Sequence, residues 1–149
     1  MRSRAWPCIC ALAALVLSAT ARDVAAAESV WSGLVIANNV AQPAPVPVDL
    51  RRLEETLKEL FGYNQFKVIG QANKTLKTGD EDWLASSKYF SLHVDSRIST
   101  SSSYVLNLQL FQEQKLLLET EAKLSKSSPL VIKGPQVGDG QLLLVLVVQ

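Results

Sequence analysis

The chain has 149 residues, 48% of them hydrophobic, and a formal net charge of +1 from 15 basic and 14 acidic side chains. The basic residues are scattered rather than grouped, which excludes the strongly positive surface expected for binding nucleic acid or an anionic membrane. The length fits one domain behind a short leader and is sufficient to bury a core.

The first 27 residues have the pattern of a secretory signal peptide. Arg2 and Arg4 precede an apolar run over residues 6–19, which is shorter than the ~20 residues of a membrane-spanning helix. Two A-x-A patterns follow this run. We expect cleavage after Ala27, with cleavage after Ala21 as the alternative and an uncleaved N-terminal anchor as the less favoured interpretation.

Both cysteines, Cys8 and Cys10, lie in this leader, so the mature chain of residues 28–149 would contain no thiol. An exported domain without disulfides depends on its core alone, which is more typical of a bacterial envelope protein than of a small eukaryotic secreted module. We therefore expect a periplasmic or extracellular location, with no transmembrane segment after the leader is removed. The mature chain is nearly neutral, with 12 basic and 13 acidic side chains.

Residues 49–61 form the clearest element, an amphipathic helix. Asp49 is the predicted N-cap, and Val48 should pack across it against Leu53 as a hydrophobic staple. Gly62 is placed to end the helix in the left-handed conformation. The predicted apolar stripe consists of Leu50, Leu53, Leu57, Leu60 and Phe61.

Two features border this helix. Residues 41–48 contain three alternating prolines, which favour an extended connector. Arg51 and Arg52 fall in the first helical turn, where the helix dipole disfavours positive charge, so they cost a little stability or serve a contact. We favour the interpretation that both arginines are solvated surface charges.

After the helix, alternation of apolar and polar residues predicts half-buried antiparallel strands within 64–76, 88–97, 103–112 and 115–124, and short apolar runs predict the other strands. We therefore predict an α+β fold in one domain, residues 28–149, with a single helix packed on a mainly antiparallel, strongly curved sheet of about six or seven strands. Residues 77–82 and 99–103 are expected to be loops, and 136–140 a turn. The predicted strands lie within 30–39, 64–76, 88–97, 103–112, 115–124, 129–134 and 142–148.

The C-terminal run Leu142–Val148 is apolar at every position. It predicts a strand that is buried on both faces in the middle of the sheet. The helix can cover one face only. The other face needs the sheet to curl on itself, the N-terminal strand and proline segment to fold over it, or a second protein to dock. Self-coverage is favoured, but an exposed apolar face usually marks an interface. The interface candidates are Val105, Phe111, Leu117, Leu143, Val145 and Val147.

Motifs for chemistry are sparse. His93 is the one histidine, with Asp95 two residues further on, and no Gly-x-Ser-x-Gly sequence places a nucleophile. The acidic residues 80–82 lack the spacing of a calcium loop, and no glycine-rich nucleotide fingerprint is present. We therefore expect a non-enzymatic protein without a metal or cofactor.

The aromatic residues are the best candidates for a ligand site, because exposed aromatic side chains often anchor binding. Trp83 lies among acidic residues and serines in a predicted loop. The alternative, which we favour over a ligand site, is that Trp83 and Leu84 pack back onto the domain as the loop's own hydrophobic anchor. The ligand candidates are Trp83, Tyr63, Tyr89 and Tyr104.

The order of one helix and antiparallel strands resembles the cystatin-like architecture, as an analogy of element order only. The Q-x-V-x-G hairpin of cystatin inhibitors does not occur, since Gly138 directly follows Val137. We expect an exported binding or interaction module of the bacterial cell envelope, whose partner is an unknown protein or a second copy bound through the sheet. The alternative is a small ligand-binding or inhibitor-type domain that uses the aromatic residues around Trp83.

Overall fold

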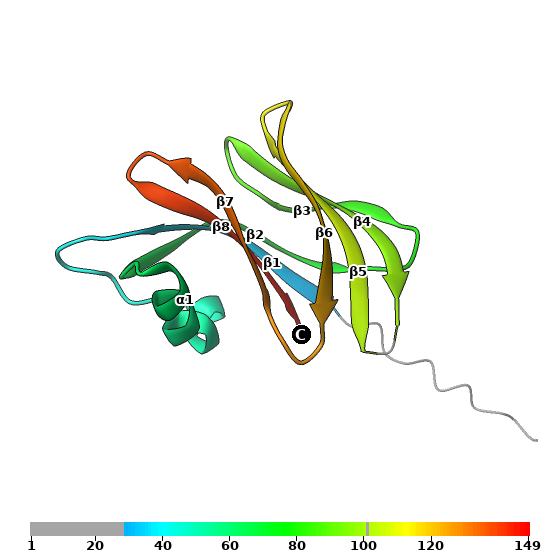
Figure 1. The fold of residues 1–149 in the computed structure, drawn as a ribbon, viewed down its shortest axis with the longest axis horizontal. Coiled ribbons are helices and arrows are strands. Elements are labelled where there is room, and N and C mark those ends of the chain that lie inside the picture. Colours follow the sequence, from blue (N-terminus) through cyan, green and yellow to red (C-terminus); the bar gives the residue numbers. More distant parts are fainter. Residues whose placement is uncertain (1–28, 101) are drawn as a thin grey trace, which may run out of the picture.

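A computed structural model describes residues 29–100 and 102–149 (Figure 1). In these ranges eight strands form two four-stranded antiparallel sheets, with the strand orders β2-β1-β8-β7 and β3-β4-β5-β6. One helical segment lies between β1 and β2, and consists of the 3-10 turn η1 (Val48–Leu53) followed by α1 (Glu54–Phe61). The strands are β1 (Ser29–Asn38), β2 (Gln65–Thr75), β3 (Glu81–Ser86), β4 (Phe90–Ser99), β5 (Ser103–Gln112), β6 (Lys115–Ser125), β7 (Leu130–Val137) and β8 (Gly140–Val148).

The predicted α+β class, with one short helix and mainly antiparallel strands, is confirmed. The prediction of a single strongly curved sheet of six or seven strands is wrong, and the cystatin-like analogy does not extend to the second sheet. The unpredicted strand is β3, which was expected to be loop. It contains no β-branched residue, and its strand structure depends on pairing with β4. The predicted signal peptide, residues 1–27, lies outside the described residues.

The two sheets pack face to face, and the larger hydrophobic core fills the space between them. The chain runs as a meander in which each strand pairs with or lies beside the next, and β8 returns to pair with β1. Leucine supplies most of this core. Its completely or almost completely buried leucines are Leu34, Leu92, Leu106, Leu108, Leu110, Leu124, Leu142, Leu144 and Leu146.

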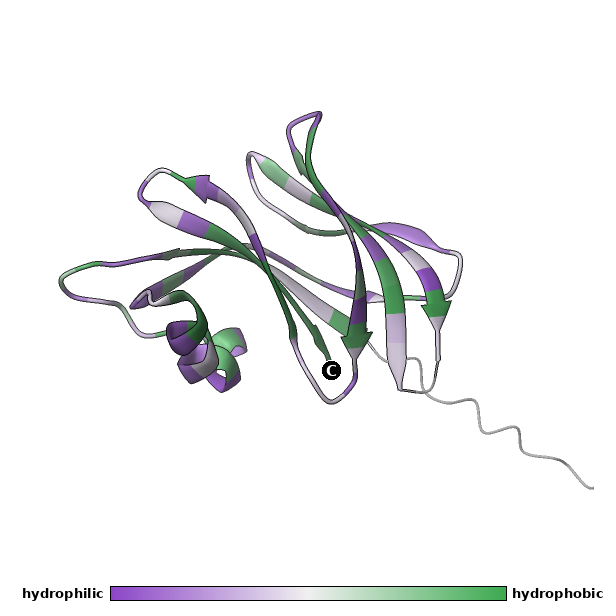
Figure 2. Ribbon diagram, viewed as in Figure 1, coloured by the Kyte–Doolittle hydropathy of each residue, from purple (hydrophilic) through white to green (hydrophobic). Residues whose placement is uncertain are grey.

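Strand β8 lies between β1 and β7, so the predicted central position of the apolar tail is confirmed. Leu144 and Leu146 belong to the core between the sheets, whereas Leu143 and Val145 belong to a second cluster beneath the helical segment. All four side chains are completely buried. Figure 2 shows the strand as apolar along most of its length. The second sheet therefore covers one face of the tail, and the helical segment covers the other.

The helical segment covers the outer face of the first sheet. Leu50, Leu53 and Leu57 are buried there together with Trp31 of β1 and Phe66 of β2. The spacing of these three leucines places them on one side of the segment, because both the 3-10 and the α repeat return to the same face after three or four residues. The helical segment therefore forms a third layer, which packs on the outer face of the first sheet through this second cluster.

The start of the segment differs from the predicted helix. It begins as a 3-10 turn whose N-cap is Pro47, with no side-chain hydrogen bond at the cap, so the prediction of Asp49 as N-cap is wrong. The predicted staple is also wrong, because Val48 is 73% exposed and Leu53 packs beneath the helix instead. The three-residue repeat of the 3-10 turn is what directs Leu50 and Leu53 to the same face.

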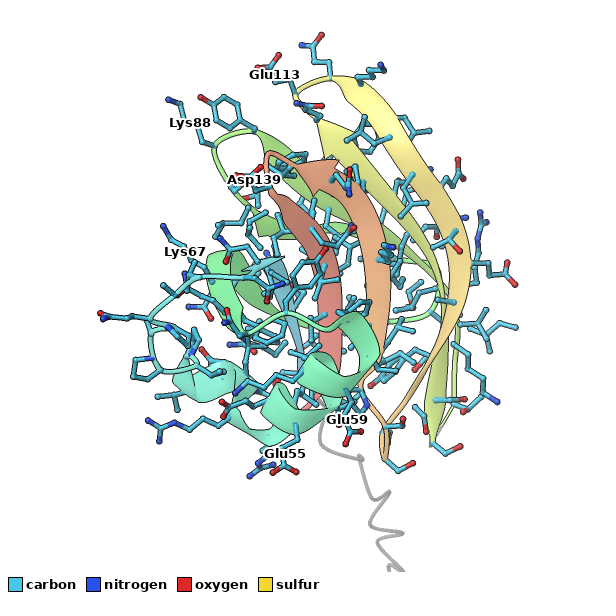
Figure 3. All side chains as sticks on the ribbon, turned by 60° about the vertical axis from the view of Figure 1, so that its left-hand side comes forward. Glu55, Glu59, Lys67, Lys88, Glu113 and Asp139 are labelled. Carbon is cyan, nitrogen blue, oxygen red and sulfur yellow. The ribbon has the colours of Figure 1, made fainter. Side chains whose placement is uncertain are left out.

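The end of the segment matches the prediction more closely. Gly62 has φ 70° in the left-handed region, and its N–H donates a 2.9 Å hydrogen bond to the carbonyl oxygen of Lys58. Leu60 departs from the predicted stripe and is 65% exposed. Glu55 and Glu59 lie on the exposed side of α1 (Figure 3).

One side of the molecule holds the two sheets together through close contact of β2 with β3. A Cβ atom on Gly70 of β2 would lie 2.1 Å from the backbone oxygen of Ser86 in β3, so only glycine fits there without a backbone shift. Nearby, the N–H of Ala85 in β3 donates a buried 3.0 Å hydrogen bond to the hydroxyl of Ser32 in β1. We call the region of these two contacts, Gly70 with Ser86 and Ala85 with Ser32, the β2–β3 seam.

Candidate binding face

The outer face of the second sheet is a sheet surface that no other part of the described chain covers. The inner faces of both sheets meet in the core, and the helical segment lies on the outer face of the first sheet. We call the uncovered surface the tryptophan face. Its side chains include Glu81, Trp83, Ser91, His93, Asp95, Ile98, Val105, Asn107, Gln109, Phe111, Leu116, Glu119, Glu121 and Lys123.

A row of four paired residues crosses the middle of the tryptophan face. Trp83 of β3 pairs with His93 of β4, and His93 pairs with Gln109 of β5. Gln109 pairs with Glu119 of β6, and its Nε2 donates a 3.3 Å hydrogen bond to Oε1 of Glu119. Because neighbouring strands lie about 4.8 Å apart, the row presents an indole, an imidazole, an amide and a carboxylate over about 14 Å.

Trp83 is held by two other rings. Its ring centroid lies 4.9 Å from that of His93, at an interplanar angle of 63°, and 5.7 Å from that of Phe111, at 58°. Leu116 pairs with Phe111 and extends the apolar area, with 44% of its surface exposed. Trp83 itself remains 51% exposed. An indole that is fixed by neighbouring rings on a strand, with half its surface free, is preorganised to anchor a partner.

His93 acts as a packing partner of Trp83. Its Nδ1 atom is buried and has no hydrogen-bond partner within the described residues. Asp95, which the sequence places on the same side, is instead paired with Arg97, with 3.3 Å between Oδ2 and Nη2. The imidazole therefore contributes its ring surface, rather than a hydrogen-bonded relay, to the tryptophan face.

Carboxylates outnumber cations on the tryptophan face. A surface with this balance has a negative potential, which attracts positively charged groups. Arg97, at the edge of the face, is already paired with Asp95. The carboxylates are Glu81, Asp95, Glu119 and Glu121, and the remaining cation on the face is Lys123.

The structure brings Trp83, a ligand candidate, and Phe111, an interface candidate, into direct contact on one surface. Tyr89 is also exposed, but it lies in the turn between β3 and β4, where the Lys88 ammonium is 5.2 Å from its ring centroid. The N–H of Glu113, in the turn between β5 and β6, donates to the Tyr89 carbonyl oxygen. Figure 3 shows Lys88 and Glu113 together at this end of the molecule.

The other predicted residues do not share one surface. Val105 lies on the tryptophan face and is half-buried. Tyr104 and Leu117 pack in the core between the sheets. Leu143 and Val145 are completely buried, so they lie inside the fold rather than on a face open to a partner. The cluster beneath the helical segment includes Tyr63, Leu143, Val145 and Val147.

Leu116 and Gln109 also belong to this surface, although they were not predicted to lie on it. Regular alternation placed Leu117 beside Phe111, but the register shifts after Leu110, so that Leu116 lies opposite Phe111. Such a bulge adds one residue to a strand and reverses the faces beyond it. The position of Gln109 could have been found, because it lies two residues from Phe111 on the same strand.

In residues 29–100 and 102–149, no group of three or more His, Cys, Asp or Glu side chains is arranged to hold a metal ion. Among the helices described in those ranges, none is both long enough and apolar enough to cross a membrane.

No protein-family model matches the chain, and no curated protein and no solved structure matches it either. A function for the protein has to follow from its own geometry and chemistry.

Proposed function

We propose that the protein is an exported, non-enzymatic binding module of the bacterial cell envelope that recognises a protein partner through the tryptophan face. The observation that carries this proposal is the half-exposed indole of Trp83, held in mid-strand by His93 and Phe111. Tryptophan is among the residues that contribute most to binding at protein interfaces.

The charge of the tryptophan face favours a partner segment that carries arginine or lysine side chains. A cation placed over the free face of an indole is attracted by the ring, by about 0.5–2 kcal/mol. The surrounding carboxylates, Glu119 and Glu121 among them, would add electrostatic attraction and speed the encounter. Pairing of two copies through this face is disfavoured, because it would bring the carboxylates of one copy against those of the other.

Replacing Trp83 with alanine should weaken the binding of a basic peptide by about 30-fold, because loss of a hot-spot side chain costs about 2 kcal/mol or more. The probe is hexa-arginine, titrated into the exported protein at low ionic strength by isothermal titration calorimetry. Its affinity should fall as salt is added.

Tyr89→Ala is the matched control, because Tyr89 is also 51% exposed but lies in a turn at the end of the sheet. It should leave hexa-arginine binding within about twofold of the original value. The proposed recognition would be contradicted by equal losses in the two variants, or by equal binding of hexa-glutamate. A dimer in light scattering that Trp83→Ala dissociates would show that the face binds a second copy instead.

Export can be tested separately from binding. When the full chain is expressed in a bacterial host, the product should be recovered outside the cytoplasm, and its intact mass should correspond to a chain beginning at Glu28. A chain beginning at Arg22 would indicate cleavage at the alternative site. Recovery of a chain that retains Met1 in the cytoplasm or in the membrane fraction would argue against export with cleavage.

A further inference from the structure

A groove separate from the tryptophan face opens between the start of the helical segment and the turn that joins β6 to β7. Its volume is about 760 Å³, which is within the ~300–1,000 Å³ that is usual for small-molecule sites. None of the residues that line it belongs to the tryptophan face. In Figure 1 the β6–β7 turn lies beside the C-terminus, and the helical segment lies along the outer face of the first sheet.

The base of the groove is apolar. Trp31, which is 2% exposed, and Leu53, which is 8% exposed, line it together with Val147 of β8. Val48 stands at the groove as well and is 73% exposed, although it is apolar. An exposed valine beside an apolar recess provides contact area for an apolar ligand, which would remove both from water.

Among the charged side chains that line the groove, Asp49 lies where the helix dipole stabilises its charge, whereas Arg52 does not. Arg52 is exposed, forms no ion pair within the described residues, and lies two residues before α1, whose N-terminal end disfavours a cation. Asp49 lies in the first helical turn, where the dipole favours an anion. Lys126, on the other wall, adds a second positive charge beside the hydroxyl groups of Ser127 and Ser128.

We propose that this groove binds an amphipathic anion, with the apolar body against Trp31 and Val147 and the anionic head at Arg52. A carboxylate, phosphate or sulfonate head would receive charge-assisted hydrogen bonds from the guanidinium group. Asp49 also lines the groove, so a cationic head is the competing chemistry and has to be tested directly. The site is independent of the binding function proposed for the tryptophan face.

The probe is sodium decanoate, titrated into the exported protein by calorimetry below its micelle concentration. Nonyl glucoside and nonyltrimethylammonium carry the same nine-carbon alkyl chain with a neutral and a cationic head. We expect one decanoate per protein molecule, bound about tenfold more tightly than either comparison compound. Equal affinity for the three compounds, tighter binding of the cation, or no binding of decanoate would overturn the proposal.

Arg52→Gln should weaken decanoate binding about tenfold, because it removes the charge that meets the head group. Arg51→Gln is the matched control, since Arg51 is the adjacent exposed arginine and does not line the groove. Val48→Asp should also weaken binding, and the fold should tolerate it because Val48 is largely exposed.

Trp83→Ala should leave decanoate binding unchanged, since Trp83 lies on the tryptophan face and outside the groove. If Arg51→Gln reduced binding as much as Arg52→Gln, or if Trp83→Ala abolished it, decanoate would not be bound in this groove. If the unmodified protein bound decanoate but did not bind hexa-arginine, the groove would be supported and the proposed function refuted.

Discussion

Replacing Leu144 with alanine should lower the free energy of unfolding by about 3–5 kcal/mol. Leu144 is completely buried in β8, paired with Leu34 of β1 and Ile132 of β7, and it belongs to the core between the sheets. The cavity left behind would be only partly closed by its neighbours. Since domains of this size are stable by about 5–15 kcal/mol, the variant should be close to unfolded. Urea denaturation followed by circular dichroism measures the change.

Two control variants make this expectation specific. Leu116→Ala removes the same atoms from a side chain that is 44% exposed on the tryptophan face, and it should cost about 1 kcal/mol or less. Leu143 is next to Leu144 in the chain and lies on the opposite face of β8. Leu143→Ala should lower the free energy of unfolding about as much as Leu144→Ala. If Leu143→Ala were nearly silent, the helical segment would not cover that face of the tail.

Replacing Gly70 with alanine should destabilise the protein by about 2–3 kcal/mol, in the range of overpacked sites. The added Cβ would lie 2.1 Å from the oxygen and 2.6 Å from the carbonyl carbon of Ser86. Backbone atoms cannot turn aside as a side chain can, so β2 and β3 would have to separate. Denaturant unfolding gives the loss of stability.

Hydrogen exchange shows whether that loss arises at the β2–β3 seam. The Ala85 amide, which is bonded to the Ser32 hydroxyl, should exchange faster in the Gly70→Ala variant. Gly134→Ala is the comparison, because the nearest atom to its added Cβ is the Leu142 oxygen at 3.1 Å, a contact that a small shift can relieve. Equal destabilisation by both variants, with slow exchange at Ala85, would contradict a close contact between Gly70 and Ser86.

The arrangement of three layers explains where binding can occur. The helical segment and the second sheet cover the two faces of the first sheet, so both faces of the apolar C-terminal strand β8 are buried inside the fold. The outer face of the second sheet is left without a cover, and its exposed or half-exposed apolar side chains are Trp83, Ile98, Val105, Phe111 and Leu116. In the proposed function, a partner would therefore meet the tryptophan face rather than the buried C-terminal strand.

The local pattern of apolar and polar residues predicted most of the helices and strands but not the candidate binding face. Alternation identified β2, β4, β5 and β6, because a strand with one buried face has alternating apolar and polar residues, and short apolar runs identified β1, β7 and β8. It missed β3, whose acidic start and single tryptophan have no clear period, and it therefore placed Trp83 in a loop. The contact of Trp83 with His93 and Phe111 joins three strands, and no short stretch of sequence records that contact.

By itself, the sequence determined which faces of its elements are apolar. The leucine spacing in 50–57 fixed the buried side of the helical segment, Gly62 fixed its end, and the uninterrupted apolar run 142–148 required a strand buried on both faces. Only the tertiary structure decided what covers each of those faces and which side chains meet on the open one. Strand order, register and the bulge opposite Leu110 depend on contacts between residues far apart in the chain, and local periodicity holds no information about them.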